Sequence, residues 1–281
     1  MENQTIQSAQ NALRNAPSGV YFQQGSKEPV KTFYSTSRTG VADVLEQAAN
    51  EGYQALFIPE LALAKSESPE LWKNWFVTPS IRATGRTKQG TPIVIYAHVP
   101  NFYSDPKNIR DAIKGNKLVN GAGPIPQEAF NSLESKNGNG RVFVVDYNTL
   151  KNSSSGVIAV DDALVHPQTI PFLGGEDTAK RYLAKHKEVY GNKIGVWHYD
   201  DLKDQPLGRM LCVGDDDGGL SGNVDLGDYG RVFGVAPEAQ SVVQKNSVPV
   251  TLESKVELIH NGKALRHEGK TYILAPDGLE L

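Results

Sequence analysis

The spacing of apolar residues predicts helices in several parts of this chain. In residues 39–52, Val41, Val44 and Leu45 fall on one helical face, and Gly52 follows the last turn. The clearest helix is predicted over 175–193, where acidic residues come first, basic residues follow, and tyrosine, leucine and valine supply the apolar surface. Other helices are expected over 3–15, 68–76, 105–116 and 125–140, with Ser68 and Asp105 as N-terminal caps of two of them.

Short apolar runs between these helices predict β-strands. Residues 80–99 have the pattern of two strands joined by a turn at Gln89-Gly90. Residues 141–147 form an apolar run of the type that is buried on both faces of a sheet. Further strands are expected over 53–59, 194–198 and 208–214. The predicted fold class is therefore α/β or α+β, with a central mixed β-sheet and flanking helices.

The C-terminal part of the chain has a different pattern. The sequences VELIH, KALRH and KTYIL are three five-residue runs joined by the dipeptides NG and EG, which are typical of tight turns. We therefore predict a main α/β domain over residues 1–240 and a C-terminal β-meander over 241–281. The meander is expected either as a small subdomain or as part of the same domain, at the edge of its main sheet.

Composition narrows the class of protein. The chain has 281 residues and a net charge of −3, and no run of lysine or arginine suggests a nucleic-acid partner. No apolar run approaches the roughly 20 residues that span a bilayer, and the polar N-terminal segment lacks the apolar region of a signal peptide. Cys212 is the lone cysteine, which fits a reducing compartment. We therefore expect a soluble cytoplasmic protein.

Residues 264–271 match a nucleotide-binding motif only in part, and the structure predicted around them does not fit that motif. Residues 264–271, ALRHEGKT, end like a phosphate-binding loop, but alanine stands where the first glycine is required. The motif needs a following helix, whereas the pattern here predicts a strand, a tight turn and another strand. We do not expect a nucleotide site there.

Polar residues follow several of the predicted strands. Glu60 follows 53–59, and the other strands end near His98, Asp146, His198 and Asp200. If the strands are parallel, their carboxyl ends meet at one edge of the sheet, where ligands bind in open α/β folds. The residues predicted to be catalytic are His98, Asp146, His198 and Asp200.

Histidine and aspartate side chains at the strand ends suggest a divalent metal ion as the cofactor. His198 and Asp200 are two residues apart and suit zinc, manganese or iron. The alternative is that these residues simply end strands and cap turns. His98 also belongs to a predicted antiparallel hairpin and need not lie on the same edge as Asp146.

Residues 215–230 form an acidic loop with five aspartates and five glycines. Asp215, Asp217 and Asp225 could supply oxygen ligands to calcium or magnesium. The spacing of a known calcium loop is absent, and aspartate and glycine are ordinary turn residues. A solvated turn is therefore the favoured interpretation, with an ion site as the alternative.

The remaining histidines are expected to have structural or surface positions. His166 lies in a rigid, apolar segment that we interpret as a packed connector, with the wall of a pocket as the alternative. His186 is expected on the polar face of the helix over 175–193, and His260 and His267 are expected to be exposed in the meander.

Two functional hypotheses follow. The first is a small-molecule hydrolase or related enzyme, with a metal-dependent mechanism as one option. The second is a non-enzymatic binding or assembly protein that offers the edge strands of its C-terminal meander to a partner. A small-molecule ligand and a homo-oligomer are compatible with both.

Overall fold

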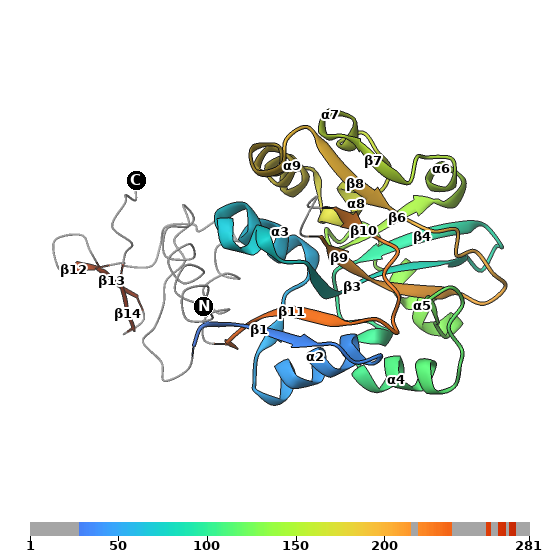
Figure 1. Ribbon diagram of the computed structural model, residues 1–281, viewed down its shortest axis with the longest axis horizontal. Coiled ribbons are helices and arrows are strands. Elements are labelled where there is room, and N and C mark those ends of the chain that lie inside the picture. Colours follow the sequence, from blue (N-terminus) through green and yellow to red (C-terminus); the bar gives the residue numbers. More distant parts are fainter. Residues whose placement is uncertain (1–27, 215–218, 238–256, 260–263, 268–269, 274–281) are drawn as a thin grey trace.

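The computed structural model describes residues 28–214 and 219–237 in full, and the backbone of three C-terminal strands. Helices and strands alternate along the chain (Figure 1). The strands of the main body are β1 (Val30–Ser35), β2 (Gln54–Ala55), β3 (Phe76–Arg86), β4 (Pro92–Ala97), β5 (Gly123–Pro124), β6 (Val142–Asp146), β7 (Gly156–Ala159), β8 (Lys193–Trp197), β9 (Leu207–Val213), β10 (Leu220–Ser221) and β11 (Gly230–Val235). The α-helices are α2 (Gly40–Asn50), α3 (Ile58–Glu67), α4 (Pro106–Lys114), α5 (Gln127–Glu134), α6 (Tyr147–Lys151), α7 (Val160–Ala163), α8 (Thr169–Leu173) and α9 (Glu176–Tyr190). Two 3₁₀ helices, η1 (Pro69–Lys73) and η2 (Phe102–Ser104), complete the described helices.

The strands of the main body form two sheets. The larger sheet has the order β6-β4-β3-β9-β10-β8-β7, and β5 pairs with β9 beside this path. The smaller sheet has the order β1-β11-β2. Among the described strands, β8 and β10 run parallel and the other pairs run antiparallel. The sheet is therefore mixed, and the predicted α+β class is confirmed.

Hydrophobic residues fill both faces of the large sheet. Val94 and Tyr96 of β4 belong to a core that also contains residues of α3, α8 and α9. Ile93 and Ile95 point to the opposite face and join a core with residues of α2, α4 and α5. Each fully buried aliphatic side chain stabilises the fold by roughly 1.5–3 kcal/mol. Helices thus cover the sheet on both sides, as Figure 1 shows.

Several local predictions are confirmed. The helix predicted over 39–52 is α2, and the helix predicted over 175–193 is α9. The predicted hairpin is formed by β3 and β4, and Gly90 in its turn has a φ of 86°, a conformation that glycine adopts without strain. The Asp105 side chain accepts a hydrogen bond from the Lys107 N–H at 2.9 Å and caps α4, as expected.

Two local predictions are wrong, and one is confirmed in part. Residues 53–59 form the two-residue strand β2 and then the start of α3, where Pro59 stands in the first turn. Over 68–76, a helix does begin at Pro69 with Ser68 at its N-cap position, but it is the short 3₁₀ helix η1, the Ser68 hydroxyl makes no cap hydrogen bond, and β3 begins at Phe76. The run over 141–147 contains β6, which lies at the edge of the sheet and is mostly half-buried. An apolar run by itself does not distinguish an edge strand from a central one.

The backbone of the C-terminal strands follows the predicted meander. β12 (Glu257–Ile259) pairs antiparallel with β13 (Ala264–His267), and β13 pairs antiparallel with β14 (Lys270–Ile273). The prediction of a helix over 3–15 lies outside the described residues, and so does His260. Among the described helices, none has the length and apolar character needed to cross a bilayer.

Candidate functional site

His98 follows the end of β4 and is 1% exposed. Its Nδ1 lies 3.0 Å from the Ser80 hydroxyl, and its Nε2 lies 2.9 Å from the carbonyl oxygen of Pro171. The Ser80 oxygen also accepts a hydrogen bond from the Ile58 N–H at 2.8 Å. The hydroxyl therefore donates to Nδ1, and Nε2 carries the proton that is donated to Pro171. Burial lowers the pKa of His98 to about 4, so a neutral ring links β3, β4 and α8.

Asp146 lies at the other end of the β4–β6 pair. Its side chain accepts hydrogen bonds from the N–H and the hydroxyl of Thr149, at 2.7 and 2.9 Å, and caps α6. These bonds lower the pKa of this exposed carboxyl. In the antiparallel register Asp146 stands opposite Ile93, five residues before His98. At ~3.3 Å per residue, the two backbones are separated by about 16 Å along the strand.

His198 follows β8 and has His166 as a neighbour. The two rings are 6.0 Å apart, and both residues are buried. His166 Nε2 lies 2.8 Å from the carbonyl oxygen of Ser154, and His198 Nε2 lies 3.3 Å from the Ser153 hydroxyl. Burial, and then the positive charge of Arg82, lower the pKa of His198 to about 4. His166 is thus a packed residue, and its pKa is also lowered by burial.

Asp200 points to different partners from those of His198. It accepts a hydrogen bond from the Tyr147 hydroxyl, and its other oxygen lies 3.4 Å from the Lys151 ammonium. The hydrogen bond from Tyr147 contributes most to lowering the pKa of Asp200. Asp200 is therefore near α6, whereas His98 contacts α8. His98, Asp146, His198 and Asp200 therefore do not all meet at one edge of the sheet. The antiparallel pairing of β4 and β6 places His98 and Asp146 at opposite ends of that pair.

The expected metal ligands do not form a metal site in the described residues. No group of three or more histidine, cysteine, aspartate and glutamate side chains in residues 28–214 and 219–237 is placed to hold a metal ion. Asp225 accepts a hydrogen bond from the Gly227 N–H at 2.7 Å, as in a turn. Asp215 and Asp217 lie outside the described residues.

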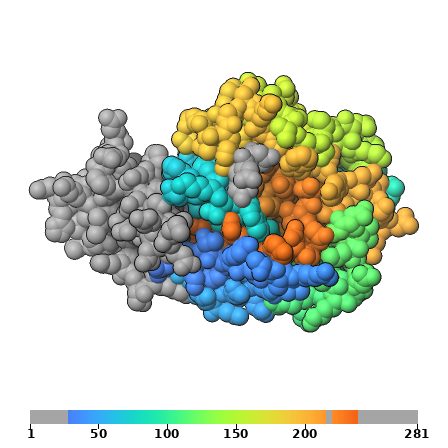
Figure 2. Space-filling view, viewed as in Figure 1, coloured from blue at the N-terminus to red at the C-terminus, as the bar shows by residue number. Residues whose placement is uncertain are grey.

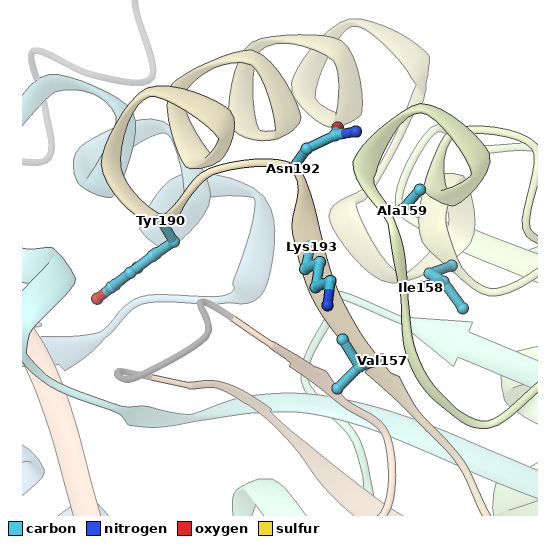
Figure 3. A pocket seen from close by; sticks show the side chains of 6 residues that line it. All are labelled: Val157, Ile158, Ala159, Tyr190, Asn192 and Lys193. Carbon is cyan, nitrogen blue, oxygen red and sulfur yellow. The ribbon is translucent and has the colours of Figure 1, made fainter.

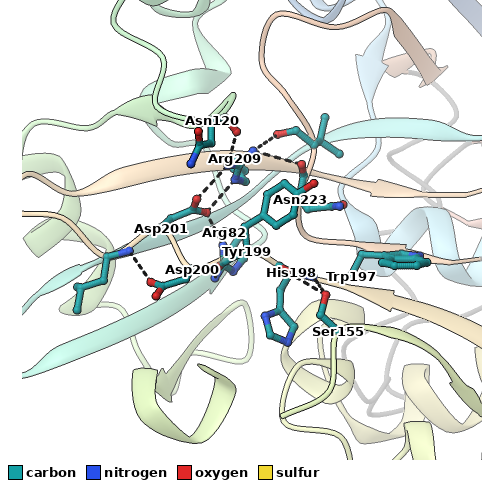
Figure 4. Close-up of polar contacts among 12 residues, drawn as sticks. Arg82, Asn120, Ser155, Trp197, His198, Tyr199, Asp200, Asp201, Arg209 and Asn223 are labelled. Carbon is teal, nitrogen blue, oxygen red and sulfur yellow. Dashed lines mark hydrogen bonds and ion pairs between the residues drawn. The ribbon is translucent and has the colours of Figure 1, made fainter. Parts of the chain in front are cut away.

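A buried ionic network of Asp201, Arg82 and Arg209 lies next to Asp200 in the chain, and the sequence pattern does not predict it. The Asp201 carboxylate is bound by Arg82 at 2.7 Å and by Arg209 at 2.8 and 2.9 Å, and all three side chains are at most 4% exposed (Figure 4). Arg82 and Arg209 stand in buried strands, where a charge needs a partner. The available signal in the sequence was Arg209, which stands beside the apolar run of 210–213.

The arginines of this network also bind backbone carbonyl groups. Arg82 donates to the carbonyl oxygen of Tyr199 at 2.7 Å. Arg209 donates to the carbonyl oxygens of Asn120 at 2.5 Å and of Asn223 and Val224, both at 3.2 Å. Only main-chain atoms of these four residues accept these hydrogen bonds, so no side chain among them is a direct partner. Asn120 has a φ of 50°, a conformation that favours asparagine or glycine at this position.

Two uncharged side chains, the buried Gln168 and the exposed Ser155, bind neighbouring loops in the same way. Gln168 is fully buried, and its amide donates to the carbonyl oxygens of Trp197 at 3.2 Å and Leu220 at 3.0 Å. The Ser155 hydroxyl donates to the carbonyl oxygen of His198 at 2.9 Å and accepts from the N–H of His198 at 3.0 Å.

Five residues whose carbonyl oxygens accept these hydrogen bonds have side chains that are partly or fully exposed. We call these five positions the display surface. The Tyr199 side chain is 51% exposed, and the Arg209 guanidinium lies 5.0 Å from the centre of its ring. Its members are Asn120, Trp197, Tyr199, Asn223 and Val224.

A separate open groove lies beside the edge strand β7 (Figure 3). The exposed Val157 and the residues Tyr190 and Lys193 contribute to its lining. Its lining contains one charged residue, Lys193, and no histidine or carboxylate. The groove therefore offers neither an imidazole nor a carboxylate for acid–base chemistry.

Comparison with known proteins found a solved structure that is similar to this chain in sequence and fold. No family model matches the chain, and no curated protein matches it. A solved structure described as "Accommodation of massive sequence variation in Nanoarchaeota by the C-type lectin fold" matches with 53% sequence identity and a TM-score of 0.68. The match covers 73% of this chain and 97% of that one.

This comparison overturns the prediction of a small-molecule hydrolase. The relative has the C-type lectin fold, which is a binding fold and not an enzyme fold. The metal-dependent version of that prediction is wrong for the described residues, since they hold no metal-binding group. Of the two hypotheses, non-enzymatic binding agrees with the relative.

Proposed function

Because this chain belongs to the same C-type lectin fold family as its nanoarchaeal relative, we propose that it is a binding protein whose display surface tolerates wide changes in sequence. The relative is described as accommodating massive sequence variation by this fold. The proposal transfers that property to this chain and assigns it to Asn120, Trp197, Tyr199, Asn223 and Val224.

The observation that carries the proposal is the way in which buried side chains hold the display surface. Arg82, Gln168 and Arg209 bind carbonyl oxygens of all five of its residues. A substitution on the surface removes no donor or acceptor atom of these hydrogen bonds. Surface substitutions of this kind usually change stability by no more than about 0.5 kcal/mol.

The residue types on the display surface suit recognition of a partner. Tyrosine and tryptophan offer large contact areas with few rotatable bonds, and asparagine offers adaptable hydrogen bonds. Tyr199 is half exposed and rests against Arg209, so little conformational entropy is lost when a partner covers it. The earlier expectation of a small-molecule ligand stays a prediction.

The proposal is tested by randomising the five positions of the display surface in a yeast-displayed library. We expect most members to remain folded, as measured by resistance to protease, and selection against unrelated folded proteins to enrich binders. The matched control is a library randomised at Arg82, Gln168 and Arg209, which we expect to be largely unfolded because buried polar groups lose their partners. Equal loss of folding in the two libraries would overturn the proposal.

Three further expectations remain proposals at this stage. The chain is expected in a reducing, cytoplasmic compartment, because a sequence with Cys212 as its single cysteine fits such a compartment. Use of the meander strands β12 to β14 as an edge for a partner and formation of a homo-oligomer also remain proposals.

A further inference from the structure

The Arg231 guanidinium lies over two aromatic rings, those of Tyr34 on the small sheet and of Trp75 just before β3. It is 4.7 Å from the ring centre of Tyr34 and 5.1 Å from that of Trp75. The two ring centres are 6.3 Å apart, at an interplanar angle of 73°. Tyr34 and Arg231 are direct partners in the β1–β11 register, so their side chains lie on the same face. The adjacent blue and orange surfaces of Figure 2 belong to these regions of the chain.

This cluster is accessible to a partner. Tyr34 is 49% exposed, and Arg231 and Trp75 are partly exposed. Tyr229, two residues before Arg231, is 50% exposed. Tyrosine, tryptophan and arginine are the residue types that most often dominate the binding energy of protein interfaces.

The position of the guanidinium is fixed by a neutral partner. Arg231 Nη1 donates to Asn74 Oδ1 at 2.7 Å. The main-chain carbonyl oxygen of Asn74 accepts a hydrogen bond from the buried Lys65 ammonium at 2.9 Å. The same ammonium donates to the carbonyl oxygen of Gly214 at 2.9 Å. The residue that orients Arg231 is therefore itself anchored in the protein interior.

Arg231 lacks an acidic partner within residues 28–214 and 219–237. The contrast with Arg110, which binds Asp43 and Glu46 at 3.0 and 2.7 Å, is clear. A guanidinium has five N–H donors, and one of those of Arg231 is used by Asn74. The remaining donors match the two oxygens of a carboxylate.

Charge also selects among anionic partners. Aromatic rings and arginine can bind single-stranded nucleic acid, but such binding depends on several phosphate contacts along a basic groove. This chain has a net charge of −3, and three aspartates follow Gly214 in the sequence. A single carboxylate of a protein partner fits one oriented guanidinium better than a polyphosphate backbone does.

We propose that Arg231, flanked by Tyr34 and Trp75, binds an aspartate or glutamate side chain of a protein partner. This inference rests on the proposed binding function and adds the chemistry of the partner. The rings exclude water from the ion pair and bind the apolar part of the partner's side chain. Arginine is required in preference to lysine, because a planar fork both stacks on rings and binds a carboxylate with two hydrogen bonds.

The experiment selects binders from a phage-displayed library of random peptides against the full chain. We expect the binders to be enriched in aspartate or glutamate and to bind Arg231→Lys about tenfold more weakly or worse, since this is the loss that defines an important interface residue. Tyr34→Ala, which removes one ring and leaves Asn74 in place, is expected to weaken the same peptides. The matched control is Arg181→Lys, because Arg181 is 54% exposed and pairs with Glu67 at 3.5 Å. Thermal unfolding of each variant verifies that it is folded.

The outcomes separate this inference from the proposed function. Failure to enrich any binder would contradict the binding function itself. Binders without acidic residues, or acidic binders that bind wild type and Arg231→Lys equally well, would overturn the carboxylate site while leaving the binding function in place. Preferential enrichment of single-stranded DNA in a parallel selection would assign the cluster to nucleic acid. If a variant with Asp215→Asn, Asp216→Asn and Asp217→Asn binds the peptides much more tightly than the wild type, the same molecule supplies the carboxylate and the inference of a partner carboxylate is overturned.

Discussion

Arg209 binds both carboxylate oxygens of Asp201, through Nε at 2.8 Å and Nη2 at 2.9 Å, in the interior of the protein. Arg82 adds a third hydrogen bond at 2.7 Å, so one negative charge lies between two positive ones. Removing the carboxylate would leave two guanidinium groups buried without a counter-charge. Loss of one partner from a buried ion pair costs about 3–5 kcal/mol.

The first prediction concerns this carboxylate. Asp201→Asn is expected to lower the free energy of unfolding by about 3–5 kcal/mol, as measured by urea denaturation. Asp204→Asn is the control, because Asp204 is exposed in the same loop and should change stability by less than about 0.5 kcal/mol. Equal stability of Asp201→Asn and the wild type would show that the network does not hold the loop.

The second prediction concerns pH and the buried ring of His98. Its pKa is about 4 in the folded chain and 6.5 as an ordinary histidine, so between these values the unfolded state binds more protons. Stability is therefore complete above about pH 6.5 and falls as the pH is lowered toward 4. A difference of about 2.5 pKa units corresponds to about 3 kcal/mol.

This contribution is measured from urea denaturation at a series of pH values. His98→Gln is expected to be less stable at neutral pH and to lose less stability on acidification. Ser80→Ala is the control, because it weakens the same contact at Nδ1 but keeps the titrating ring. If His98→Gln shows the same pH dependence as the wild type, the ring does not contribute as described.

Local elements of the fold could be predicted from the sequence because their signals are local. The β3–β4 hairpin needs a turn at Gly90 and two apolar strands, and both are contained in 80–99. The α2 helix likewise has its apolar face and its end within one short segment. The start of α3 was missed although Pro59 is a common residue at the first turn of a helix.

The arrangement of the candidate site could not be predicted, because it depends on strand order. The convergence of His98 and Asp146 required parallel strands, and the antiparallel β4–β6 pair places them at opposite ends. His186 was expected to be solvated, but it is buried against Trp72, which comes from a distant part of the sequence. Asp201 is absent from the predicted site, since its partners Arg82 and Arg209 are brought to it only by folding.

The third prediction concerns the contact between α2 and β11. A Cβ atom added to Gly230 would lie 2.1 Å from the carbonyl oxygen of Gly40, and one added to Gly40 would lie 2.6 Å from the backbone nitrogen of Gly230. Neither backbone atom can move aside as a flexible side chain could. Gly230→Ala is therefore expected to lower the free energy of unfolding by about 3 kcal/mol or more, at or beyond the usual range for overpacking.

The measurement for Gly230→Ala is again chemical denaturation. Gly90→Ala is the comparison, since a Cβ there meets no atom within 4 Å and the cost comes only from its φ of 86°. That cost should be about 1 kcal/mol. A Gly230→Ala variant no less stable than Gly90→Ala would contradict the close contact.

The fourth prediction concerns the boundary between the main body and the C-terminal segment. Nearly all of the solved relative is matched by less than three quarters of this chain, so the shared fold does not need the remainder. A chain that ends at residue 240 is expected to retain cooperative thermal unfolding and the circular dichroism of a mixed α and β protein. A chain that ends at residue 229 is the control. It lacks β11, the central strand of the small sheet, and with it Val232 and Phe233, and it is expected not to fold.

Light scattering on the chain that ends at residue 240 tests the role of the meander in assembly. If β12 to β14 join copies of the protein, the full chain will form a larger species and the shortened chain will be monomeric. Loss of cooperative unfolding in the shortened chain would place the C-terminal segment inside the main domain, and the predicted boundary at 240 would then be wrong.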